Sequence, residues 1–121
     1  MPLWLSTGIY MKEVKKKWGH EKIIINCKEY CGKLLYIDKG AQCSLHMHPV
    51  KKETFYVLRG LVDISIDGKR YIVVSHDRPK TILPGTYHQF MGITDAVILE
   101  ISTHHEDDDC IRKSESRSSN G

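Results

Sequence analysis

Two histidines and a glutamate lie close together in the middle of this sequence, within the segment GAQCSLHMHPVKKETFYVLRG. His46 and His48 are two residues apart, and Glu53 follows five residues later. In a β-strand, residues two apart point to the same face, about 7 Å apart at Cα, so both imidazoles would face one way. Imidazole nitrogens and carboxylate oxygens are ligands of zinc, iron and manganese. The spacing therefore predicts part of a metal site on a strand.

A turn after His48 would let the chain return beside the two imidazoles. Pro49 and two lysines suit such a turn, and a new strand from Glu53, paired antiparallel with the first, would bring its carboxylate next to them. His88, just after the Pro-Gly turn of LPGTYHQF, is available as a fourth ligand. Ligand types, spacing and turn positions together favour one divalent transition metal (zinc, manganese or iron) at these four residues over a chance cluster.

Composition limits the class of protein. The chain has 121 residues, which is the size of one domain, and its 40% hydrophobic and 27% charged residues are ordinary for a soluble globular protein. The apolar runs are far shorter than a membrane span, the start is a poor signal peptide, and a net charge of +3 is too small and mixed to indicate nucleic-acid binding. We expect a cytoplasmic protein with free thiols that binds neither membrane nor nucleic acid.

Short strands separated by turn sequences account for residues 21–102. Nine segments rich in β-branched and aromatic residues are expected to be strands: 21–26, 33–37, 43–48, 54–60, 61–67, 70–74, 81–83, 87–91 and 96–102. Such a pattern predicts an all-β sandwich or barrel. We expect residues 18–112 to form a single domain, with 1–17 as an N-terminal extension or arm and 113–121 as a disordered polar tail.

The predicted ligand pattern resembles the two signature motifs of the cupin superfamily. The first motif matches residues 40–60, which begin and end with glycine, and the second matches TILPGTYHQFMG, which keeps Gly85 and His88. This resemblance implies a cupin-type jelly-roll barrel, also called a double-stranded β-helix. It also implies that one metal is bound by four residues: His46, His48, Glu53 and His88.

A narrower resemblance covers about residues 15–112. The segments KKWG, GKLLYIDKGAQCSLHMH, ETFYVLRG, PGTYH and ILEISTHHEDDDCIR are similar to the cupin domain of bacterial mannose-6-phosphate isomerases of the bifunctional type. His46 departs from that pattern, because those isomerases commonly have glutamine there. The resemblance implies a metal-dependent aldose–ketose isomerase whose substrate is a small molecule, either a sugar or a sugar phosphate.

Three charged residues are candidates for this chemistry. Glu100 interrupts the apolar strand AVILEIS and could be the catalytic base, or it could face solvent. Lys33 could act in catalysis or bind a sugar hydroxyl or phosphate, or it could be a surface lysine. Arg112 could bind a phosphate with its bidentate guanidinium, or it could pair with the acidic run 106–109.

Two other function classes stay open on the sequence alone. The first is a non-haem iron cupin dioxygenase, because a histidine-rich iron site with open positions activates oxygen. The second is a non-catalytic cupin that binds a sugar or another small molecule.

The strands that carry the ligands also predict an assembly. If the ligands face the interior, then Leu45, Met47, Tyr56 and Leu58 face outward without charges between them. Contiguous apolar surface usually marks a contact, so we expect a homodimer about a two-fold axis. The competing explanation is that residues 1–17 cover the same patch within one chain.

Overall fold

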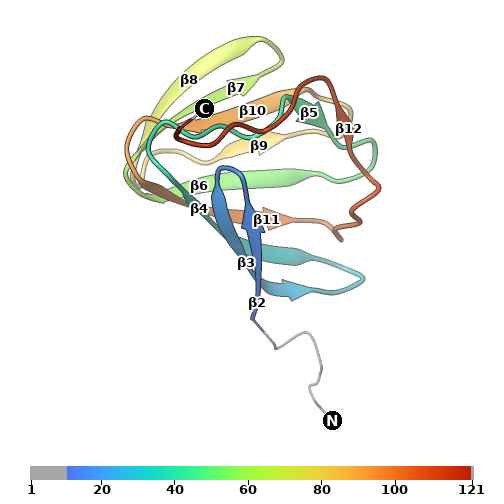
Figure 1. Ribbon diagram of the computed structural model, residues 1–121. Helices are drawn as coiled ribbons and strands as arrows, with labels where there is room; N and C mark the ends of the chain where they lie inside the picture. Colours follow the sequence, from blue (N-terminus) through green and yellow to red (C-terminus); the bar gives the residue numbers. More distant parts are fainter. Residues whose placement is uncertain (1–10, 121) are drawn as a thin grey trace.

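Two antiparallel β-sheets packed face to face make up the protein (Figure 1). The computed structural model describes residues 11–120, and those residues contain no helix, hence none that could cross a membrane. The first sheet has five strands in the order β12 (Ile111–Arg112), β5 (His46–Met47), β10 (His88–Gly92), β7 (Leu61–Ile66) and β8 (Lys69–Val74). The second has six, in the order β2 (Lys12–Lys16), β3 (Gly19–Asn26), β4 (Cys31–Ile37), β11 (Ala96–Ser102), β6 (Glu53–Arg59) and β9 (Lys80–Ile82). The predicted all-β architecture is confirmed.

Every segment predicted to be a strand contains one, although the segment 43–48 is a strand only at His46–Met47. Strands β2 and β12 were not predicted, because the first has no apolar alternation and the second is two residues long. The expected domain boundary at residue 18 is too late, since β2 pairs with β3 along its whole length. Residues 1–10 of the predicted arm lie outside the described residues.

The inner face of the six-stranded sheet changes character along its strands. Alternation in β4, β11 and β6 turns every second side chain toward the interior. In register, Leu35, Ile98 and Val57 form an apolar row, and in the next row Lys33 lies opposite Glu100. One end of the interior is therefore an apolar core and the other end holds buried charges. Further buried residues from both sheets complete the core: Trp18, Ile37, Ala41, Cys43, Phe55, Val62, Ile64, Val73, Ile82, Phe90 and Ala96.

The short loop after β5 crosses from one sheet to the other. Strand β5 pairs with β10 and β12, whereas β6 pairs with β11 and β9. The prediction that the strands of His46 and Glu53 pair with each other is therefore wrong. Residues 49–52 instead span the gap of roughly 10 Å between packed sheets. Glu53 consequently faces the histidines across the interior.

This crossing also divides the surface that was expected to form a dimer. Met47 belongs to the five-stranded sheet and Leu45 directly precedes its strand β5, whereas Tyr56 and Leu58 belong to the six-stranded sheet. The outer faces of two packed sheets point in opposite directions, so these four residues cannot form one contiguous surface.

The outer face of β4, β11 and β6 is mostly apolar, and its one charged side chain is exposed Arg59, which lies opposite Val97 at one end. Register places Leu99 between Leu34 and Tyr56, so the apolar groups are contiguous across three strands. The outer face of β8 differs, because exposed Arg70 lies on it beside Ile72. The nine positions other than Arg59 on the outer face of β4, β11 and β6 make up the uncharged face: Gly32, Leu34, Tyr36, Thr54, Tyr56, Leu58, Val97, Leu99 and Ile101.

Residues 113–120, at the red end of the chain in Figure 1, run along the segment that leads into β5. The hydroxyls of Ser114 and Ser116 accept hydrogen bonds from the backbone amides of Leu45 and Ser44. The structure therefore departs from the disordered tail expected for these residues. The serines of this polar segment satisfy backbone amides that the sheet itself leaves without a partner.

Candidate metal centre

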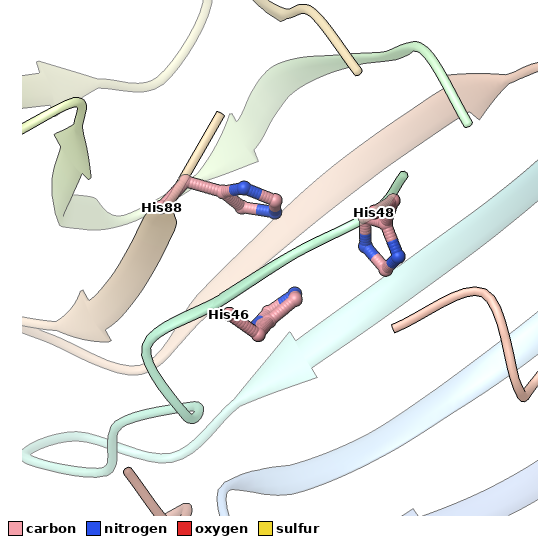
Figure 2. Close-up of side chains that lie close together, drawn as sticks. All are labelled: His46, His48 and His88. Atoms are coloured by element: carbon pink, nitrogen blue, oxygen red, sulfur yellow. The ribbon is translucent and has the colours of Figure 1, made fainter. Parts of the chain in front are cut away.

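Three histidines converge between the two sheets (Figure 2). His46 lies on β5, His48 follows two residues later, and His88 begins β10 directly opposite His46. Their ligand nitrogens all lie within 4.8 Å of one another. Alternation along the chain brings the first two together, and the pairing of β5 with β10 adds the third.

The Pro-Gly turn before β10 directs His88 to this point. Gly85 has φ of +78°, in the left-handed region that glycine adopts most readily. Its amide donates a hydrogen bond of 2.8 Å to the carbonyl of His48. The turn therefore ties the segment of one ligand to the segment of another.

Each of the three imidazoles is oriented by a hydrogen bond between Nδ1 and a backbone carbonyl. A neutral imidazole that donates from Nδ1 keeps its lone pair on Nε2. Proteins commonly orient histidine ligands toward a metal in this way. The carbonyl acceptors are Ser44 for His46 (2.7 Å), Asp109 for His48 (2.7 Å) and Thr86 for His88 (2.9 Å).

Glu53 completes the set from the opposite sheet. Its Oε2 lies 2.9 Å from Nε2 of His88 and 3.3 Å from Nε2 of His48. Burial opposes its ionisation, but the contacts with His48 and His88 and the nearby Lys51 ammonium hold the pKa of Glu53 well below 4.5. Glu53 is therefore ionised, and a glutamate must be ionised to bind a metal.

Two buried atoms of this cluster have no hydrogen-bond partner among residues 11–120: Oε2 of Glu53 and Nε2 of His88. The short contact between them lacks hydrogen-bond geometry, so a carboxylate oxygen and an imidazole nitrogen face each other in a buried place without a hydrogen bond. Such an arrangement is costly unless a cation lies between the two groups. Three imidazoles and one carboxylate are a donor set that suits zinc, iron or manganese, so the residues present fit a divalent metal.

The surroundings of His46 favour its neutral form. Burial and the neighbouring His88 lower the pKa of His46 to about 3. A histidine must be unprotonated to bind a metal, so His46 is ready to do so at neutral pH.

A cavity of about 710 Å³ opens between the sheets, and His46, His48 and Glu53 lie on its wall. This volume is within the range of small-molecule sites. Aromatic and aliphatic side chains of the core form one part of the wall, and buried charged groups form another. The basic residues on the wall are Lys12, Lys15, Lys16, Lys33, Lys51 and Arg112.

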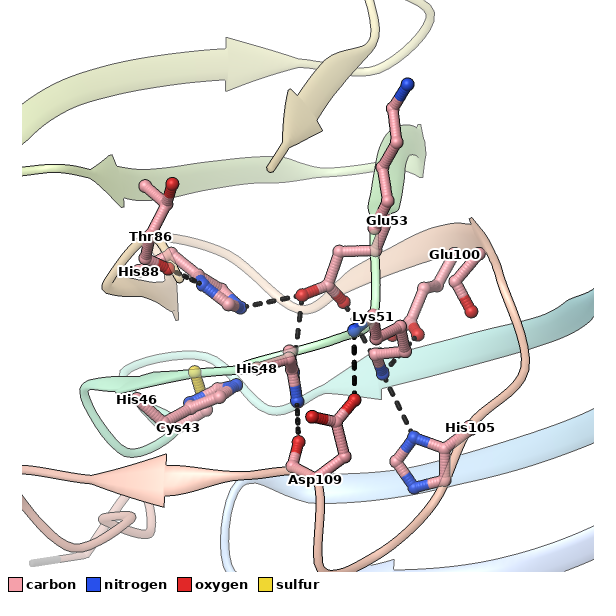
Figure 3. Close-up of polar contacts among 12 residues, drawn as sticks. Cys43, His46, His48, Lys51, Glu53, Thr86, His88, Glu100, His105 and Asp109 are labelled. Atoms are coloured by element: carbon pink, nitrogen blue, oxygen red, sulfur yellow. Dashed lines mark hydrogen bonds and ion pairs between the residues drawn. The ribbon is translucent and has the colours of Figure 1, made fainter. Parts of the chain in front are cut away.

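Glu100 is buried on the wall of this cavity, so the alternative that it faces solvent is wrong. Its Oε2 lies 3.2 Å from Nζ of Lys51, which in turn lies 3.7 Å from Oε1 of Glu53 (Figure 3). Burial and the charge of Glu53 raise the pKa of Glu100, while Lys51 and Lys33 oppose this shift. A buried carboxylate with a raised pKa beside a candidate metal site is a candidate general base.

Lys51 is a further candidate that the sequence pattern did not indicate, because the two lysines after Pro49 suit a turn. Its side chain is buried, and Nζ also lies 3.0 Å from Nδ1 of His105. Burial lowers the pKa of Lys51, but the negative charges of Glu100 and Glu53 raise it by more. The pKa of Lys51 is therefore above its usual 10.5. Its spacing of two residues from Glu53 was a usable signal, since residues two apart in an extended chain share a face.

Lys33 and Arg112 differ in their surroundings. Lys33 is buried, with Nζ 3.6 Å from Glu21, so it is not a surface lysine.

Arg112 is exposed at the cavity, where its backbone pairs with His46. Within residues 11–120, Arg112 forms no ion pair with the acidic run 106–109. The first two acids of that run contact His104 and His105, which accounts for both histidines without a second metal site.

Comparison with known protein families gives one match. A family model described as a cupin domain matches residues 33–102, which is more than half of the chain and contains all four candidate ligands. No curated protein matches the chain.

Solved structures share the fold at low sequence identity. An RmlC-like cupin from Shewanella frigidimarina NCIMB 400 has a TM-score of 0.74 and 18% identity, over 85% of this chain and 92% of that one. KdgF from Halomonas sp. has a TM-score of 0.68 and 19% identity, over 74% and 81%. Streptomyces PAC13, solved with uridine, has a TM-score of 0.78 and 13% identity, over 99% and 97%. These structures confirm the jelly-roll fold.

Proposed function

The chain belongs to the cupin family, and we propose that it is a metal-dependent isomerase that interconverts an aldose and a ketose. The observation that carries this proposal is the buried Glu100, which lies on the wall of the same cavity as the candidate ligands. A cupin that only binds sugar has no need of a base there. An iron dioxygenase needs open metal positions, but it does not need a carboxylate fixed by an ammonium.

Proton transfer between adjacent carbons accounts for the residues in the cavity. A divalent ion bound by the three histidines and Glu53 would supply a Lewis acid that polarises the substrate carbonyl. Glu100 takes the proton from the neighbouring carbon, which leaves an enediol, and returns it to the former carbonyl carbon while a hydroxyl proton moves between the oxygens. Lys51 holds one oxygen of Glu100 and favours its ionised form. Lys33 can donate a hydrogen bond to a sugar hydroxyl.

Proton and oxygen measurements separate the three functions. Purified protein with added Zn(II), Mn(II) or Fe(II) is incubated in D₂O with a set of aldoses, ketoses and their phosphates, and NMR follows conversion and deuterium at the carbon next to the carbonyl. An isomerase interconverts one pair without consuming oxygen. Oxygen uptake with Fe(II) would identify a dioxygenase, and binding without turnover would identify a sugar-binding protein.

Arg112→Ala is expected to raise KM for a sugar phosphate about 10- to 100-fold and to leave a neutral sugar unaffected. Arg112 has no ionic partner among residues 11–120, so its guanidinium is available to a phosphate at the cavity mouth. Hydrogen bonds to charged groups contribute about 1.5–3 kcal/mol, and each 1.4 kcal/mol is tenfold. Steady-state kinetics with both substrates measures this. Arg70→Ala is the control, because Arg70 pairs with Asp63 away from the cavity. An equal effect on both substrates would contradict the assignment.

We propose further that the protein is a homodimer that uses the uncharged face on β4, β11 and β6. Two copies of a face without charges can meet about a two-fold axis without opposing like charges. The side chains of this face are partly exposed, and Ile101 is more than half exposed, and contiguous apolar surface within reach of solvent usually marks a contact.

Light scattering is expected to give twice the chain mass for the parent and a single chain mass for Leu99→Asp. Leu99 is at the centre of the uncharged face, so a charge there opposes its own copy. Ile72→Asp, on the outer face of the other sheet, is the matched control and should stay dimeric. A monomeric parent at micromolar concentration, or a dimer lost only in the Ile72 variant, would reject this surface.

A further inference from the structure

A C-terminal segment, residues 103–113, runs beside the loop that joins the histidine motif to Glu53. Both ends of this segment form hydrogen bonds with residues close to the loop or in it. Lys113 donates a backbone hydrogen bond to Leu45, and Thr103 exchanges two hydrogen bonds with Lys52. The loop that crosses between the sheets is therefore bordered by a segment about sixty residues later in the chain.

Asp109 makes three hydrogen bonds to this loop, more than any neighbour in its segment, and Figure 3 shows those with His48 and Lys51. Its backbone carbonyl accepts from Nδ1 of His48 at 2.7 Å. Its carboxylate accepts from two successive amides, Val50 to Oδ1 and Lys51 to Oδ2, each at 2.9 Å. One residue thus contacts the part of the loop that orients a candidate ligand and the part that carries Lys51.

The chemistry of these contacts requires a carboxylate. Two adjacent N–H groups point at Asp109, and only a carboxylate offers one acceptor oxygen to each of them. An asparagine would satisfy one amide and turn an N–H₂ group toward the other. Because the carboxylate fixes the residue to the loop, its carbonyl stays in place to accept from His48, which leaves the Nε2 lone pair of His48 for a metal.

We propose that Asp109 is a positioning residue for the metal centre, which sets the tautomer and orientation of His48 and the course of the loop that carries Lys51. This inference depends on the metal site of the proposed function, but not on any particular reaction. The acidic residues beside it differ. Asp107 contacts His105, and Asp108 is exposed and makes no hydrogen bond or ion pair with the described residues.

Cobalt(II) titration of the full chain tests this inference, with calorimetry for affinity and visible absorption for coordination geometry. Asp109→Ala is expected to weaken Co(II) binding about 10- to 100-fold, the effect typical of residues that orient metal ligands, and to change the absorption bands. Asp109→Asn should show a smaller loss, because one amide keeps its acceptor. Asp108→Asn makes the same change of charge one residue away and should match the parent.

The outcomes are distinguishable. Asp109 variants that are less stable to heat but bind Co(II) with the parent's affinity and spectrum would overturn the inference and leave the metal site intact. A parent that binds no Co(II) would overturn both the metal site and the inference. If Asp109→Ala does not fold, the Asn variant decides, and an equal loss in Asp108→Asn would show that charge alone is responsible.

Discussion

Glu53→Ala is expected to abolish metal binding, with a loss of affinity larger than the roughly 10- to 100-fold loss caused by changing a residue that only orients a ligand. Glu53 is the only ligand of the set that comes from the six-stranded sheet, and it is the only one that carries a negative charge. Without it, three neutral imidazoles remain on one side of the cavity. Elemental analysis after dialysis measures the bound metal. His46→Ala, His48→Ala and His88→Ala should each lose most of the metal as well.

Glu29→Ala is the matched control, because Glu29 is exposed in the turn before β4 and contacts no part of the site. The Glu53 variant should stay folded, since the apolar core between the sheets does not include Glu53. Full metal content in Glu53→Ala would contradict the ligand assignment. Complete unfolding of the variant would instead identify a structural metal, whose binding energy is part of the folding energy.

Glu100→Gln is expected to lower the rate of isomerisation about 10²- to 10⁴-fold, the usual contribution of a general base. Glutamine keeps the size of the side chain and can still accept a hydrogen bond from Lys51, but it cannot take a proton from the substrate. Metal content should equal that of the parent, which separates a catalytic role from a role in building the site. A variant with the parent's rate on the identified substrate would remove Glu100 from the mechanism.

The pH dependence of the parent gives a second test of the same residue. Glu100 must be ionised to act as a base, and burial together with Glu53 raises its pKa above the ordinary 4.5. The rate should therefore fall on the acidic side at a pH higher than an ordinary glutamate would give. In Glu100→Gln the remaining activity should not show this acidic limb.

The alternation of side chains was enough to predict most of the candidate site. It brought His46 and His48 to one face, and the turn before His88 indicated where a further ligand would enter. The partner of each strand could not be predicted in this way, because alternation tells which residues share a face and not which sheet a strand joins. Glu53 therefore reaches the histidines from the opposite sheet, although the sequence suggested a neighbouring strand.

The residues around the ligands depended on contacts distant in sequence. Lys51 is buried because its ammonium meets Glu100 and His105, both about fifty residues away in the chain. Asp109 lies in an acidic run that resembles a solvated surface segment until its contacts with the loop after His48 are known. Only the folded structure shows that the acidic run and the loop after His48 lie side by side.

The most direct test of the central claim is an anomalous difference map from a crystal of the full chain grown with zinc. The claim is that His46, His48, Glu53 and His88 bind one ion. The expected result is a single peak about 2.0–2.2 Å from Nε2 of each histidine and from a carboxylate oxygen of Glu53. A crystal with no peak between the two sheets, or with its peak at His104 and His105 instead, would contradict the account.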